Sequence, residues 1–129
     1  MADKINLVVL SGERERLQMA AMMASVGAVS GSEVNVFLSM NAMPHFIKGA
    51  SEDAPAGGKL GELMKEKDVI SFMTLFEQAV TLGEAKIYAC SMAMDVLGVT
   101  QNDLKEFVTE PLGLTKFMDI AKEGQTWTF

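Results

Sequence analysis

The chain has 129 residues, a length that suits one compact domain over residues 1–129. Hydrophobic residues make up 49% of it and charged residues 22%, which is too apolar for a chain that stays disordered. Eleven basic and seventeen acidic residues give a formal net charge of −6, and a negative surface repels phosphate backbones, so nucleic acid is not an expected partner.

The chain opens with a predicted strand, a helix and a second strand. Residues 5–10 form a short apolar run rich in β-branched side chains, as in a strand buried on both faces. Residues 13–29 repeat apolar side chains at helical spacings, and their methionines make this helix apolar nearly all round. It is therefore covered on two sides within the monomer or packed against another subunit. A strand over residues 33–39 follows, and the intervening helix favours parallel pairing of the two strands.

A loop and another long helix are predicted for the middle of the chain. Residues 49–61 contain four glycines and one proline among polar residues, a composition typical of a mobile surface loop that could cover a site. Residues 71–82 repeat apolar side chains at helical spacing. Gly83 suits a left-handed cap, so we expect this helix to end there.

The last third of the chain continues the alternation of strands and helices. Residues 86–90 predict a strand and residues 91–97 a short helix that ends near Gly98. Four further elements are expected: a short helix through residues 104–105, a strand over residues 107–110 ended by Pro111, a helix over residues 114–122, and a strand over residues 125–129 with one better-buried face. This order predicts an α/β fold, a three-layer flavodoxin-like sandwich with a mainly parallel sheet of about five strands.

Sulfur-containing residues point to the cellular compartment. One cysteine cannot close an intramolecular disulfide, and eleven methionines would be oxidised outside a reducing compartment, so we expect a cytoplasmic location. The N-terminus lacks the basic and apolar regions of an export signal. The longest charge-free stretch, residues 17–32, is shorter than the ~20 apolar residues of a membrane span, so no transmembrane helix is expected.

Candidate site residues follow the predicted strands, because sites in parallel α/β sheets form outside the carboxyl ends of the strands. The residues placed there are Ser11, Gly12, His45, Cys90 and Ser91. Cys90 lies near the first turn of a helix, where free backbone N–H groups and the helix dipole favour a thiolate. Such a sulfur is a nucleophile, and this makes Cys90 the principal candidate.

The main candidates could also have purely structural roles. Free cysteine is among the most buried residue types, so Cys90 could be a small core side chain. His45, the only histidine, could assist the sulfur or bind an anionic substrate, or it could be a solvated loop residue. Asn41 could complete a Cys–His–Asn arrangement, but a triad drawn from abundant residue types is a weak signal.

Metal and nucleotide motifs are incomplete in this sequence. Gly58 and Lys59 resemble the end of a phosphate-binding loop, but Asp53 stands where a glycine is required and Leu60 where Ser or Thr would hold magnesium. One cysteine and one histidine are too few for a closed zinc site. The methionines are scattered through apolar segments and indicate packing rather than copper ligation. We expect no metal and no cofactor.

Residues 86–98, KIYACSMAMDVLG, resemble the DsrE/DsrF-like family, in particular its branch of small peroxiredoxin-like DsrE proteins. In outline the likeness extends over the whole chain. The resemblance implies a small parallel α/β domain that forms homo- or hetero-oligomers and carries sulfur on a cysteine at the end of a strand, which is Cys90 here. It also implies cytoplasmic sulfur trafficking with rhodanese-like or TusA-like carriers as partners. Without a second cysteine, a peroxidase cycle would need an outside thiol.

The sequence, with this resemblance, predicts a sulfur carrier or sulfurtransferase-like protein. Cys90 would attack a persulfide or thiosulfonate donor, hold the sulfur and pass it to a partner thiol. The predicted substrate-binding residues are Ser11, Gly12, His45, Tyr88 and Ser91. The alternative is a non-catalytic oligomeric binding or assembly protein with a structural cysteine. A weaker alternative is a nucleotide- or flavin-binding domain that uses the loop at Ser11 and Gly12.

Overall fold

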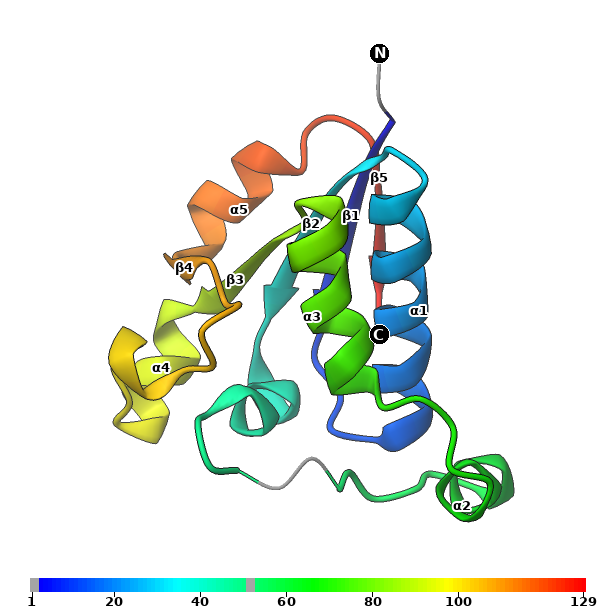
Figure 1. The fold of residues 1–129 in the computed structure, drawn as a ribbon. Coiled ribbons are helices and arrows are strands. Elements are labelled where there is room, and N and C mark those ends of the chain that lie inside the picture. Colours follow the sequence, from blue (N-terminus) through cyan, green and yellow to red (C-terminus); the bar gives the residue numbers. More distant parts are fainter. Residues whose placement is uncertain (1–2, 51–52) are drawn as a thin grey trace.

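The computed structural model describes residues 3–50 and 53–129, and its central feature is one parallel sheet with helices on both faces (Figure 1). Within these residues the sheet holds five strands in the order β4-β3-β2-β1-β5, and every neighbouring pair is parallel. The strands are β1 (Lys4–Val9), β2 (Glu33–Leu38), β3 (Lys86–Cys90), β4 (Glu110–Leu112) and β5 (Gln125–Thr128). The predicted α/β fold class with its five-stranded parallel sheet is confirmed.

Two long helices, α1 (Arg14–Val29) and α3 (Phe72–Gly83), lie side by side over one face of the sheet (Figure 1). The strand side chains beneath them are apolar. Leu7, Val36 and Ile87 occupy neighbouring register positions of β1, β2 and β3 and are completely buried. Burial of one such side chain contributes about 2 kcal/mol, so this layer is the main source of stability.

Gly83 allows α1 and α3 to approach closely. A Cβ atom added at Gly83 would lie 2.4 Å from the Cβ of Ala28. The prediction that Gly83 forms a left-handed cap is wrong: Gly83 is the last residue of α3, and the left-handed residue is Glu84, with a φ of 59°. The glycine is therefore required by helix packing rather than by its own backbone angles.

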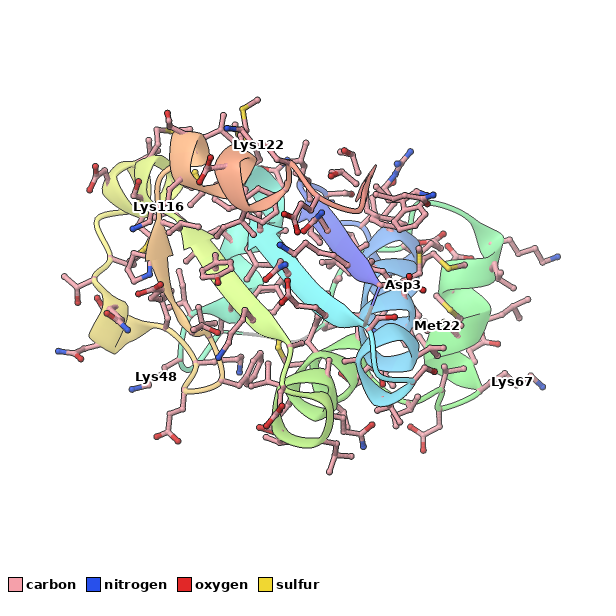
Figure 2. The ribbon with its side chains drawn as sticks, turned by 90° about the horizontal axis from the view of Figure 1, so that it is seen from above. Asp3, Met22, Lys48, Lys67, Lys116 and Lys122 are labelled. Carbon is pink, nitrogen blue, oxygen red and sulfur yellow. The ribbon has the colours of Figure 1, made fainter. Side chains whose placement is uncertain are left out.

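The opposite face of the sheet is covered by the short helix α5 (Leu114–Ile120). Seen from above, α5 with Lys116 lies across the sheet from α1 with Met22 (Figure 2). The ring of Phe117 stacks on Phe37 of β2 with centroids 4.8 Å apart and packs edge-on against Tyr88 of β3 at 6.4 Å. These contacts place Phe37 and Tyr88 on the α5 side of the sheet.

Two buried asparagines connect this face to the C-terminal turn. Asn6 and Asn35 are register partners on β1 and β2, and Asn35 Nδ2 donates a hydrogen bond to Asn6 Oδ1 at 3.3 Å. Asn6 Nδ2 donates to the carbonyl of Glu123 at 2.9 Å and to that of Gln125 at 3.3 Å. The asparagines thus hold the turn that leads into β5, because their buried amides need partners.

The remaining helical segments lie around the ends of the sheet. They are the α-helices α2 (Lys59–Glu66) and α4 (Ser91–Leu97) and the 3-10 helices η1 (Met40–Phe46) and η2 (Gln101–Asp103). Of the predicted loop 49–61, residues 51–52 lie outside the described residues, and the chain is helical from Lys59. The helix predicted through residues 104–105 is instead η2, which Thr100 and Asp103 close in a capping box.

Both edge strands differ from their predictions. The strand predicted over residues 107–110 lies over Glu110–Leu112 and includes Pro111. Proline is tolerated there because β4 has a neighbour on one side only and needs fewer N–H donors. The better-buried face predicted for β5 is wrong, since all four of its residues are exposed. As the other edge strand, β5 is paired with β1 alone.

One side of α1 remains uncovered in the single chain. Leu17, Ala21 and Ala24 pack into the core, whereas four apolar residues are exposed, so two-sided cover within the monomer is wrong. We call these four residues the α1 stripe: Met19, Met22, Val26 and Val29. Packing against another subunit stays a prediction. Among the described residues, no helix has the length and apolar character needed to cross a membrane.

Candidate functional site

The carboxyl ends of β1, β2 and β3 lead into segments that meet at one edge of the sheet. The N–H of Ala42 in η1 donates to the carbonyl of Leu10 at 3.2 Å, which ties the segment after β2 to the end of β1. A Cβ atom on Gly12 would lie 2.9 Å from the carbonyl oxygen of Asn41. Helix α4, which follows β3, packs against η1. This is the edge at which open parallel sheets bind ligands.

Cys90 is the last residue of β3 and the N-cap of α4. The predicted position at a strand-to-helix junction is therefore confirmed. Cys90 is the register partner of Leu112 of β4, and it shares the α5 face of the sheet with Tyr88 because side chains alternate along a strand. Its side chain is only 5% exposed and forms no cap hydrogen bond. Cys90 is thus a buried residue with a small exposed fraction.

Ser91 and the starts of two short helices surround Cys90. Ser91 is exposed, and a Cβ atom on Gly113, the N-cap of α5, would lie 3.9 Å from Ser91 Oγ. Helices α4 and α5 each expose apolar side chains among polar ones. We call these side chains the α4–α5 patch, and its residues are Met92, Val96, Leu97, Leu114 and Met118. Exposed apolar side chains of this kind are candidates for contact with another protein.

The other residues predicted at this edge lie on its β1 side. Gly12 packs against η1, which also carries the half-buried His45. The His45 ring stands edge-on to Phe72 at 5.9 Å. Ser11 Oγ accepts a hydrogen bond from the N–H of Glu13 at 3.0 Å. The acidic side chain of Glu13 follows this loop directly and disfavours the phosphate that a nucleotide would place there.

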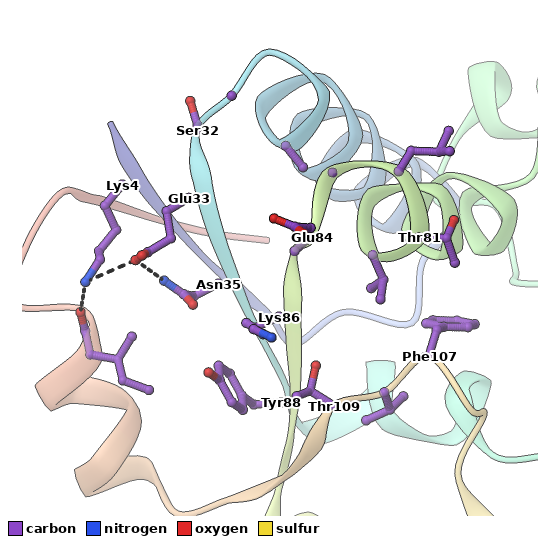
Figure 3. Close-up of a pocket in the computed structure, with 18 of the residues that line it drawn as sticks. Lys4, Ser32, Glu33, Asn35, Thr81, Glu84, Lys86, Tyr88, Phe107 and Thr109 are labelled. Atoms are coloured by element: carbon purple, nitrogen blue, oxygen red, sulfur yellow. Dashed lines mark hydrogen bonds and ion pairs between the residues drawn. The ribbon is translucent and has the colours of Figure 1, made fainter. Parts of the chain in front are cut away.

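Tyr88 lies on the same face as Cys90 and two residues before it, which is a separation of about 6.6 Å along the strand. Burial raises the pKa of Tyr88, and the carboxylates of Glu110 and Glu33 raise it further. The residue lines a cavity of about 1240 Å³ at the amino ends of β2 and β3, away from Cys90 (Figure 3). Tyr88 therefore shares a sheet face with Cys90 and also lines the cavity at the amino ends of β2 and β3.

The polar floor of that cavity was not predicted from the sequence. Asn35 lies on β2 and Lys86 on β3 at paired register positions, and both line the cavity. The sequence does contain a signal for a polar site, since Asn6 and Asn35 interrupt two otherwise apolar strand segments. That the two asparagines lie side by side, however, follows only from the register of β1 and β2.

A set of charged contacts fixes the described part of the loop to the start of α1. We call it the N-terminal clamp, and it comprises Arg14, Glu15, Asp53, Gly57 and Lys65. The Glu15 carboxylate accepts a hydrogen bond from the N–H of Gly57 at 2.8 Å. Asp53 pairs with Lys65 at 2.9 Å and with Arg14. The clamp holds the loop beside the carboxyl edge of the sheet, where α1 begins.

Both carboxylates of the clamp have lowered pKa values. Hydrogen bonds from backbone N–H groups, first that of Gly57, lower the pKa of Glu15. The hydrogen bond from Lys65 is the main cause that lowers the pKa of Asp53, and charge attraction by Lys65 and Arg14 adds to it. Both carboxylates are therefore preferentially charged when the clamp is closed.

The clamp is expected to open in acid. Because both folded-state pKa values lie below those of the unfolded chain, the stabilisation is present at neutral pH and is lost as the pH falls through the folded values. Hydrogen exchange of the Gly57 amide should accelerate on acidification beyond the change in intrinsic exchange rate. Glu15→Gln should show the faster exchange already at neutral pH, and Glu62→Gln, which changes another exposed carboxylate nearby, should not. Equal protection in Glu15→Gln and the unchanged protein would contradict this role.

No group of three or more His, Cys, Asp or Glu side chains that could hold a metal ion occurs in the part of the chain that the structure describes. The carboxyl edge offers the buried thiol of Cys90, the exposed residue Ser91 and the apolar side chains of the α4–α5 patch.

Comparison with known proteins agrees with the fold. A model of the DsrE/DsrF/DrsH-like family matches residues 51–129, more than half of the chain. The structure is similar to that of the YchN protein from E. coli, with a TM-score of 0.65, 17% sequence identity and coverage of 100% of both chains. It is also similar to MTH1491 from Methanobacterium thermoautotrophicum, a protein of unknown function, with a TM-score of 0.57, 11% identity and coverage of 98% and 99%. At these identities the structural likeness shows the fold alone. No curated protein matches the sequence significantly.

Proposed function

Because the chain belongs to the DsrE/DsrF/DrsH-like family, we propose that it takes part in sulfur relay and carries sulfane sulfur on Cys90. Family membership by itself points to a role related to sulfur relay. The finer proposal is supported by one observation: the only cysteine of the chain ends β3 at the carboxyl edge of a parallel sheet. This is the edge at which such sheets bind their substrates.

The proposed reaction consists of two exchange steps at sulfur. The Cys90 thiolate attacks the sulfane sulfur of a persulfide or thiosulfonate donor, so that a new S–S bond forms and the donor bond breaks. The donor thiolate or sulfinate, or sulfite when the donor is thiosulfate, leaves with the electron pair. The thiolate of an acceptor then attacks the outer sulfur of the Cys90 persulfide and releases the Cys90 thiolate. The sulfur is transferred without an external oxidant or reductant, and no cofactor is required.

The surroundings of Cys90 support transfer between proteins. Cys90 is buried, with 5% of the residue exposed, which favours a small donor or the extended end of a partner chain over a broad surface. The α4–α5 patch beside it offers apolar contact area for such a partner. A rhodanese-like or TusA-like carrier protein is the expected partner, and Ser91 and Tyr88 are the expected substrate neighbours on α4 and β3.

Intact-mass measurement tests this proposal. Reduced protein is incubated with glutathione persulfide and, in parallel, with thiosulfate. We expect the mass to increase by one sulfur atom, and a thiol reductant to remove the increase. If the native protein gains no sulfur from either donor, sulfur carriage by Cys90 is excluded.

A second candidate function is an oligomeric assembly protein in which Cys90 is structural. Two observations favour it: Cys90 is nearly buried, and the α1 stripe exposes four apolar side chains at helical spacing. These side chains carry no charge, so two copies of the stripe can pack together without repulsion even though the chain has a net charge of −6.

A charge placed in the α1 stripe is expected to dissociate the oligomer. Val26→Glu should lower the mass measured by sedimentation equilibrium to that of a single chain, because a buried unpaired carboxylate is costly. Leu82→Glu is the matched control, since Leu82 is equally an exposed apolar residue but lies on α3 outside the stripe. A monomeric unchanged protein, or an oligomer that survives Val26→Glu, would contradict assembly through α1.

A further inference from the structure

The β5 edge of the sheet lacks the features that usually keep an edge strand from pairing further. The other edge strand, β4, has only three residues and includes the exposed, charged Glu110. Strand β5 has no charged residue and no proline, and all four of its residues are exposed. Within the described part of the chain its one neighbour in the sheet is β1. An unprotected edge of this kind is a template for another strand.

Main-chain hydrogen bonds show which groups of β5 face outward. The N–H of Phe129 donates to the Val8 carbonyl of β1 at 2.8 Å. The N–H and C=O of one strand residue point to the same side, and successive residues alternate. Trp127 therefore also turns its main-chain groups toward β1, whereas Thr126 and Thr128 turn theirs away from it. No strand of the described residues meets the outward groups of these two threonines.

The side chain of Trp127 lies on the α1 face of the sheet. Trp127 is the register partner of Leu7, which is buried beneath α1 and α3. Register partners in a parallel pair point to the same face. Trp127 is 37% exposed, because β5 is the last strand of the sheet. Thr126 and Thr128 point to the opposite face.

The α1 stripe lies on the same flank of the molecule as β5. Ala28 of α1 faces α3, since its Cβ atom is the nearest neighbour of a Cβ added at Gly83. Val26 precedes Ala28 by two residues and is rotated by about 200° around the helix, so it faces away from α3. Figure 1 shows α3 toward the β3 side of the sheet and α1 toward the β5 side. The stripe therefore adjoins the open edge.

We propose that β5 pairs antiparallel with β5 of a second copy of the chain, so that two five-stranded sheets become one sheet in a twofold dimer. With the axis at Trp127, the N–H and C=O of Thr126 bond to those of Thr128 of the second copy. The same bonds repeat on the other side of the axis. All outward main-chain groups of both threonines are then paired. The pairing goes beyond sulfur relay and does not involve Cys90.

The outward groups of β5 fit its own copy better than an unrelated strand. They lie symmetrically on both sides of Trp127, so one twofold axis satisfies all of them. The two Trp127 residues then form a non-hydrogen-bonded pair, the closer of the two pair types, which suits contact between aromatic side chains. Neither β5 nor the α1 stripe carries charge, so the dimer brings no like charges together at this surface despite the net charge of −6.

Apolar contact supplements this short ladder. Across the axis the two β1 strands are three strand spacings apart, about 14 Å. Helices in direct contact are about 8–10 Å apart, so the two α1 helices, which pack on β1 and β2, leave room between them. The two Trp127 side chains lie in that space, on the α1 face, with the α1 stripes beside them.

Sedimentation equilibrium with paired charges tests the proposed register. The unchanged protein should have the mass of two chains or of a multiple of two. Thr126→Lys combined with Thr128→Lys places like charges opposite each other across the axis and should halve that mass. Thr126→Lys combined with Thr128→Glu places opposite charges there and should retain it. The matched control combines Thr74→Lys with Thr81→Lys on exposed positions of α3 and should also retain it.

Amide hydrogen exchange tests the same ladder without a substitution. In a single chain the N–H groups of Thr126 and Thr128 have only water as a partner, whereas that of Trp127 is bonded to β1. In the dimer all three are bonded, so we expect Thr126 and Thr128 to be protected as Trp127 is. Fast exchange of both threonines beside a protected Trp127 would overturn the proposal.

The mass measurements can contradict the pairing in three further ways. A monomer or an odd number of chains would overturn it. Equal dissociation of both charge combinations would overturn the register with its axis at Trp127. Dissociation by Val26→Glu, with full mass in the double-lysine variant of β5, would assign the assembly to α1 alone. Amide NMR spectra establish that each variant is folded. Cys90→Ser should dimerise normally, so this test and the sulfur-carriage test fail independently.

Discussion

Cys90→Ser is expected to abolish the sulfur adduct completely, while Ser91→Ala retains it. Serine has nearly the same shape as cysteine and fits the junction between β3 and α4, but its hydroxyl is not ionised near neutral pH and forms no stable bond to sulfane sulfur. Ser91 is exposed beside Cys90, so its replacement controls for disturbance of the junction. Intact mass after incubation with glutathione persulfide, followed by peptide mapping, measures both variants.

Alkylation of the native protein, together with the adduct measurement, separates a functional thiol from a structural one. A side chain that is 5% exposed should react with small iodoacetamide in the native state, and more slowly with a bulky maleimide, relative to their rates in urea. A thiol that reacts with neither reagent until the chain unfolds would favour the assembly function. An adduct that persists in Cys90→Ser would show that sulfur is bound elsewhere and would remove Cys90 from the mechanism.

Gly124→Ala is expected to reduce the free energy of unfolding by about 3 kcal/mol, the largest loss for a single methyl group in this chain. Gly124 has a φ of 82°, and a Cβ atom there would lie 2.1 Å from the carbonyl oxygen of Lys4. The added methyl group must therefore displace the backbone of the turn before β5 or of β1. That movement would also disturb the hydrogen bonds of Asn6 to this turn.

Gly98→Ala provides the matched comparison. Gly98 also has a positive φ, of 69°, but no atom lies within 4 Å of the position of an added Cβ. Its replacement should cost only the backbone strain of about 1 kcal/mol. Urea denaturation of both variants measures the difference. Equal losses would mean that the contact with Lys4 is relieved without cost and that the turn is less rigid than the structure indicates.

The carboxyl-edge site was more predictable than the cavity at the amino ends of β2 and β3. The position of Cys90 follows from an apolar strand segment and a helical segment that adjoin in sequence. That cavity is lined by Asn35, Lys86 and Tyr88, whose common face is defined only when β2 and β3 pair in a particular register. The N-terminal clamp is equally hard to predict, since Glu15 and Gly57 are separated by 42 positions in the sequence. Such contacts have no local signature in a single sequence.

The sequence by itself determined the order of strands and helices, the parallel α/β class and the place of Cys90 between β3 and α4. These follow from apolar periodicity and from glycine and capping residues, which act over a few neighbouring positions. Only the tertiary structure decided that every residue of β5 is exposed, that Gly83 is required by contact with Ala28, and that Cys90 is buried. Exposure and close approach depend on which distant segments pack together, and that is decided by the assembled sheet and its helices.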